Sequence, residues 1–98
     1  MNMAAYIASL DGAAPAPNLS APLAGLLWAA KSDWDRAHKI IQDEDSRDAA
    51  WVHAYLHRVE GDLGNAGYWY RQASQPTATD SLQAEWERIA ATLLRSRT

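Results

Sequence analysis

Three polar side chains that can bind a metal ion or move a proton lie close together in the sequence. His53, His57 and Glu60 are spaced at i, i+4 and i+7, so on a helix they project from one face. Two imidazoles one turn apart can bind a divalent metal ion, and a carboxylate can complete a set of two histidines and one carboxylate. His38 would join them if the preceding helix packs alongside. The pattern predicts either a site for a divalent metal such as zinc or an acid–base site.

The same histidines also fit a structural role. His57 takes the place in a second helical hairpin that Trp28 takes in the first, where one hairpin packs against its neighbour. A histidine at such a position is often a neutral core residue bonded to a carbonyl or a carboxylate, and a pH-sensitive contact is a third alternative. The His-Glu-x-x-His spacing of zinc proteases is absent from the sequence.

A second candidate site combines aromatic rings with an arginine. Trp51, Tyr55 and Arg58 share another face of the same predicted helix, and this combination is typical of protein-binding surfaces. Trp69 is a further candidate, because it lies in a run of three aromatic residues that cannot all point into the core. The alternative for this run is packing against the last helix and its Trp86. We expect Trp51 and Tyr55 to face outward, in a groove for a peptide, a protein or a second copy of the chain. The alternatives are a surface cation–π pair or contact with residues 3–10.

The helices that position these residues are predicted from caps and apolar spacing. Five residues can each cap a helix, namely Ser20, Ser32, Ser46, Asp62 and Asp80. The corresponding helices end near Lys31, before the acidic stretch 43–45, at Gly61, near Ala73 and at about residue 95. In the last helix Trp86 and Ile89 belong to an apolar stripe, and we expect Glu85 on the opposite, solvated face.

These elements predict an all-α fold. Residues 1–20 form a flexible N-terminal segment, with a short helix within 3–10 and a Pro/Ala linker over 11–18, where each proline disfavours a helix. Residues 21–98 form a single helical domain of two stacked antiparallel hairpins and a C-terminal capping helix. Strands are not expected, because no segment alternates with period two.

The two hairpins also repeat each other. Residues 21–45 and 50–78 share a spacing of small and large side chains, at the offset that relates Trp28 to His57. The residues that carry it are Gly25, Trp28, Trp34 and Ala37 in the first copy, and Ala54, Asp62, Ala66, Tyr70 and Ala73 in the second. This pattern resembles tetratricopeptide-type repeats, and the resemblance implies that helix 80–95 closes the stack.

A narrower resemblance covers residues 34–71. This segment, which includes Trp34-Asp35-Arg36-Ala37-His38 and Asn65-Ala66-Gly67-Tyr68-Trp69-Tyr70-Arg71, is similar to a family of small, uncharacterised bacterial and fungal proteins. That resemblance implies no reaction.

Composition excludes several classes of function. The chain has 98 residues, a net charge of −3 and no cysteine, which excludes a disulfide scaffold, a thiolate metal site and a cysteine nucleophile. The acidic balance argues against nucleic acid as a partner. No run approaches the roughly 18–20 apolar residues of a membrane helix, so we expect a cytoplasmic protein.

Five tryptophans and four tyrosines exceed what so small a core needs. The leading functional prediction is therefore a non-enzymatic module that binds a protein or peptide, or forms a homodimer, without a cofactor. The alternative is a small metal-binding or acid–base protein that uses His53, His57 and Glu60.

Overall fold

The computed structural model describes residues 2–9 and 19–95, and every regular element within them is a helix. The helices are α1 (Met3–Ala8), α2 (Ala21–Ala30), α3 (Trp34–Gln42), α4 (Arg47–Glu60), α5 (Leu63–Gln72) and α6 (Leu82–Arg95). The predicted all-α class is confirmed, and α2 to α6 are the five helices expected of the main domain. The predicted linker over 11–18 lies outside the described residues.

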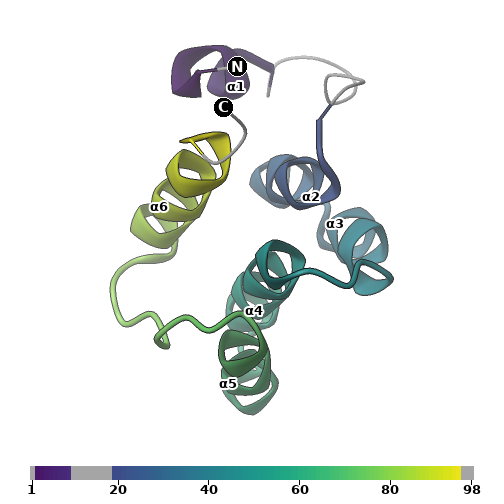
Figure 1. Ribbon diagram of the computed structural model, residues 1–98, viewed down its shortest axis with the longest axis vertical. Helices are drawn as coiled ribbons and strands as arrows, with labels where there is room; N and C mark the ends of the chain where they lie inside the picture. Colours follow the sequence, from purple (N-terminus) through teal and green to yellow (C-terminus); the bar gives the residue numbers. More distant parts are fainter. Residues whose placement is uncertain (1, 10–18, 96–98) are drawn as a thin grey trace.

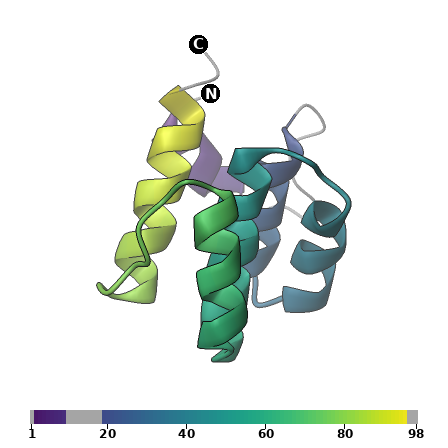
Figure 2. The ribbon, with the colours of Figure 1, turned by 60° about the horizontal axis from the view of Figure 1, so that its bottom comes forward.

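The helices form two hairpins and a closing helix. α2 packs against α3, and α4 packs against α5 (Figure 1). α4 also contacts α2 and α3, so the two hairpins stack on each other. α6 covers α4 and α2, and α1 packs against α6. Figure 2 shows α4 and α5 side by side, with the connection from α5 running back to the start of α6.

The turns of the two hairpins are built alike. Asp33 and Asp62, which stand at equivalent positions in the two sequence copies, each accept a side-chain hydrogen bond from the backbone N–H at position i+3. The backbone N–H of Asp33 donates to the carbonyl of Trp28, and that of Asp62 donates to the carbonyl of His57. The repeat in the sequence thus has a counterpart in the way both turns are closed.

Two of the predicted helix starts are displaced by one residue. Ser32 adopts a positive φ of 63° in the turn, and Asp33 caps α3 in its place. Ser81 accepts the hydrogen bond from Ala84 N–H that was expected of Asp80.

The other caps agree more closely with the sequence. Ser46 caps α4 through its side chain, and Gly61 ends α4 with a φ of 87°, a left-handed conformation that glycine adopts without strain. Ser20 stands at the N-cap position of α2 but makes no side-chain cap bond.

The core requires a close approach at Gly25. A Cβ atom built on Gly25 would lie 2.8 Å from Cγ2 of Ile41 on α3 and 3.5 Å from Cγ1 of Val52 on α4. The missing side chain at Gly25 therefore lets α2 approach both neighbouring helices.

The N-terminal helix is part of the core. Tyr6 is fully buried, its hydroxyl donates to the carbonyl of Leu23 at 2.6 Å, and its ring stacks on Trp86. Burial raises the pKa of the Tyr6 phenol. The sequence places this helix in a flexible segment outside the helical domain, whereas in the structure α1 packs against α6. The partner that α6 gives Tyr6 cannot be identified from the sequence of α1 alone.

None of the helices in the described residues is both long and apolar enough to cross a membrane.

Candidate metal centre

Three histidines from two helices converge where α3 packs against α4. His38 lies on α3, and His53 and His57 lie one turn apart on α4. One ring nitrogen from each of the three lies within 4.8 Å of the others. We refer to these three residues as the histidine cluster. The hairpin stacking thus brings in His38, as the sequence predicted it would if the helices packed in this way.

The spacing of the nitrogens suits a single metal ion. The Nε2 atoms of His38 and His53 lie 3.0 Å apart, while two nitrogens bound to one tetrahedral zinc ion are separated by about 3.3 Å when each Zn–N bond is about 2.0–2.1 Å. The ring nitrogen of His57 lies within 4.8 Å of the other two, so the His57 ring would have to move closer to bind the same ion. Three imidazoles with an open fourth position form a known type of zinc site.

Two tryptophan rings stack on histidines of the cluster. The Trp34 ring stacks on His38 with centroids 4.7 Å apart, and the Trp69 ring stacks on His53 at 3.9 Å. Trp34 is itself fixed, because its Nε1–H donates to the carbonyl of Leu56 at 2.7 Å. Trp69, predicted as part of a binding groove, is half-buried and forms one wall of the cluster. The stacking restricts the orientation of both imidazole rings.

Burial favours the neutral form of two of these histidines. Desolvation, followed by the charges of His38 and His57, lowers the pKa of His53 to about 4. The pKa of His38 is also lowered, mainly by desolvation and then by His57. Neutral imidazoles keep a free lone pair, which a metal ion requires of its ligands. His38 and His53 are therefore in the protonation state that metal binding needs at neutral pH.

Glu60 does not join the other predicted ligands. Its Oε1 lies 2.5 Å from Nδ1 of His57, and the group of possible ligands to which it belongs is the one formed with His57 and Asp62. The Asp62 carboxylate, which belongs to that second group, also caps α5 by accepting a hydrogen bond from the backbone N–H of Asn65. Among the described residues, the predicted set of His53, His57 and Glu60 is therefore not assembled, because Glu60 contacts Nδ1 of the His57 ring and does not reach His53.

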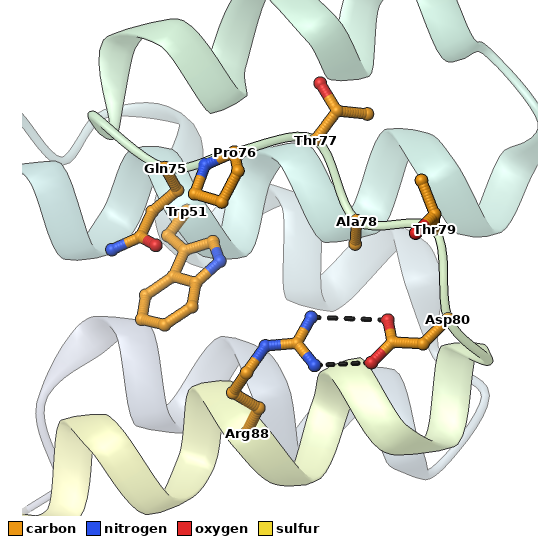
Figure 3. Close-up of a pocket in the computed structure, with 8 residues that line it drawn as sticks. All are labelled: Trp51, Gln75, Pro76, Thr77, Ala78, Thr79, Asp80 and Arg88. Carbon is orange, nitrogen blue, oxygen red and sulfur yellow. Dashed lines mark hydrogen bonds and ion pairs between the residues drawn. The ribbon is translucent and has the colours of Figure 1, made fainter.

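The predicted aromatic groove is covered. Trp51 and Tyr55 are only 6% and 7% exposed, because α6 and the connection from α5 pack over this side of α4. Figure 3 shows Trp51 directed into the space between that connection and α6. The prediction that Trp51 and Tyr55 face outward is wrong. The sequence of α4 alone does not predict that α6 covers this face.

Arg58 belongs to a buried polar network. Its Nη1 donates to Oε1 of Glu85 at 2.8 Å, and its Nη2 donates to the carbonyl of Asp80. The Tyr70 hydroxyl donates to the other carboxylate oxygen of Glu85. Glu85 is fully buried, so its predicted position on a solvated face is wrong. The amphipathic pattern of α6 does not predict the burial of Glu85, because both of its hydrogen-bond donors come from other helices.

A pocket of about 250 Å³ remains beside Trp51. It is bounded by the connection from α5 and by the ion pair of Asp80 with Arg88, at 2.5 Å (Figure 3). The two charged groups satisfy each other, so what the pocket offers a ligand is chiefly the ring of Trp51 and the polar atoms of the connection. The histidine cluster has the more specific chemistry.

No known protein family, curated protein or solved structure matches this chain.

Proposed function

We propose that the protein binds one divalent transition-metal ion, zinc foremost, through His38, His53 and His57. The observation that carries this proposal is the convergence of three ring nitrogens within 4.8 Å at the contact between α3 and α4. Here two helices and two stacked tryptophans bring the rings together.

Imidazole nitrogen suits zinc, copper and nickel, whereas calcium and magnesium prefer oxygen ligands. Bound metal would link α3 to α4 and would stabilise the stacking of the hairpins, since binding only to the folded state shifts the folding equilibrium. Water or an external group would fill the fourth position.

A hydrogen-bonded cluster without metal is the competing structural interpretation. The separation of 3.0 Å between the two Nε2 atoms also fits a hydrogen bond in which one ring donates to the other. Metal binding would displace that bond, so the proton of the donating ring must move to its other nitrogen. Titration with metal separates the two interpretations directly.

The experiment is a zinc titration of protein freed of metal and of any affinity tag, followed by calorimetry. The chain contains only three histidines, so binding that depends on histidine reports on this cluster alone. We expect one zinc ion per chain and loss of binding in His38→Gln, a half-buried position. The matched control is Glu44→Gln, an exposed carboxylate in the turn before α4. A dissociation constant weaker than about 100 μM for the wild type would overturn the proposal.

A second candidate function is a module that binds a protein, a peptide or its own copy. Trp51 and Tyr55 cannot serve it as they stand, but Val59, Leu63 and Tyr68 are exposed, and Leu63 is 68% exposed. These residues lie at the end of α4 and on α5. Sedimentation velocity over a range of concentrations tests self-association. Self-association that Leu63→Ser weakens would support the proposal, and a monomer at all concentrations would remove the homodimer.

A further inference from the structure

We infer that Glu60 is a positioning residue for this centre, which holds the His57 ring with its Nε2 directed to the metal. The inference rests on the proposed metal binding by the histidine cluster. Glu60 then has a role other than that of a ligand, namely to orient the imidazole of His57 toward the metal.

This inference is drawn from the contact between two residues in the last turn of α4. Nδ1 of His57 lies 2.5 Å from Oε1 of Glu60, with the imidazole side chain 8% exposed and the carboxylate side chain 38% exposed. A carboxylate accepts hydrogen bonds, so Nδ1 of His57 carries the hydrogen. The lone pair of the neutral ring is then on Nε2. Glu60 thereby selects one of the two tautomers.

This selection matters most for His57. The Nε2 atoms of His38 and His53 already face each other, whereas the position of His57 in the cluster depends on its ring orientation. The His57 ring is stacked on His53 and meets the His38 ring nearly edge-on, at an angle of 72°. These ring contacts hold the plane of the imidazole but do not determine which nitrogen carries hydrogen.

The carboxylate also contributes charge. Three neutral imidazoles leave the full charge of a divalent ion uncompensated, and a carboxylate bonded to the far side of one ring increases the basicity of that ligand. Loss of such an outer carboxylate commonly reduces metal affinity about 10- to 100-fold.

The test compares zinc affinity in wild-type protein, Glu60→Ala and Glu60→Gln, with Glu44→Gln as a control for the loss of one exposed negative charge. We expect Glu60→Ala to bind zinc about 10- to 100-fold more weakly. Glu60→Gln should fall between the two, because its amide oxygen still accepts from Nδ1–H. The control should match the wild type. Equal losses in Glu60→Ala and Glu60→Gln would show an effect of charge alone and would overturn the positioning role.

Two spectroscopic measurements distinguish a positioning role of Glu60 from a purely structural role and from a role as a metal ligand. In metal-free protein, nitrogen NMR of the imidazoles should show His57 with hydrogen on Nδ1, and Glu60→Ala should shift it toward the Nε2–H tautomer. In the cobalt-substituted protein the visible spectrum should keep its coordination type in Glu60→Ala. A change of coordination would make Glu60 a ligand and would overturn the inference.

The outcomes for the two proposals differ. Wild-type protein that binds no zinc overturns both the metal site and the role of Glu60. Wild-type protein that binds zinc, with an unchanged affinity in Glu60→Ala, overturns only the role of Glu60. Circular dichroism should show that the variants are folded, because Glu60 is an exposed residue at the end of α4.

Discussion

Arg58 Nη1 lies 2.8 Å from Oε1 of Glu85, although the two residues are 27 positions apart and on different helices. The Glu85 side chain is fully buried, while that of Arg58 is 16% exposed. The Tyr70 hydroxyl donates to the same carboxylate. This network joins α4, α5 and α6. It includes Arg58, which the sequence pattern assigned to an exposed binding face.

Arg58→Met is expected to destabilise the protein by about 3–5 kcal/mol, because it leaves the buried Glu85 carboxylate without its charged partner. The double variant Arg58→Met/Glu85→Gln should recover part of the loss, since the neutral amide costs less to bury. Chemical denaturation of each variant measures both effects. The control is Arg47→Met, an exposed position on α4 that should change stability by less than about 0.5 kcal/mol. A double variant less stable than the single one would contradict the explanation.

Tyr6→Ala is expected to cost about 3–5 kcal/mol, because it removes a fully buried ring that stacks on Trp86. Tyr6→Phe removes only the hydrogen bond to the carbonyl of Leu23 and should cost about 1 kcal/mol. Urea unfolding measures both. Ile7→Ala is the neighbouring control, since Ile7 is exposed. Equal stabilities of wild type and Tyr6→Ala would show that α1 does not dock on α6.

Gly25→Ala should destabilise the fold by roughly 1–3 kcal/mol, because its methyl group would collide with the branched side chain of Ile41. Gly64→Ala is the matched change in another helix, and it places a methyl group in open space. It should instead stabilise the protein by up to about 1 kcal/mol through helix propensity. Thermal unfolding compares the two variants. An increase in stability for Gly25→Ala would mean that α2 and α3 can separate without cost.

The metal-free protein should lose stability as the pH falls from about 6.5 towards 4. The folded state holds the pKa of His53 near 4, whereas the unfolded chain takes up this proton near the ordinary value for histidine of about 6.5. The unfolded state therefore binds more protons in this window, and protonation favours unfolding. His53→Phe keeps a ring against Trp69 and should flatten the profile between pH 6.5 and 4. An identical profile in both proteins would exclude His53 as the source.

Zinc should raise the unfolding temperature in a concentration-dependent way. At a free concentration 100 times the dissociation constant, binding to the folded state alone adds about 2.7 kcal/mol. His38→Gln should remove this effect while Glu44→Gln retains it. Differential scanning fluorimetry with and without a chelator measures the shift. A stabilisation that persists in His38→Gln would place the metal elsewhere.

Much of the fold and part of the site follow from local sequence. The helices and several caps, such as Ser46 and Gly61, depend on interactions within a few residues, and therefore on information that a sequence pattern contains. The spacing of His53 and His57 on α4 is equally local, because one helical turn separates them. The contact between Glu60 and His57 could be predicted only in part, since the spacing placed Glu60 near His57 but did not indicate which ring nitrogen it contacts.

Local sequence patterns account for the helical elements, the all-α class and the shared face of the α4 histidines. Which of those faces are covered depends on how distant helices pack. Packing of α6 buried Trp51 and Glu85, and packing of α1 buried Tyr6. The stacking of α3 on α4 brought His38 to His53. Helical periodicity reports which residues share a face, whereas the burial of a face depends on distant segments that pack against it.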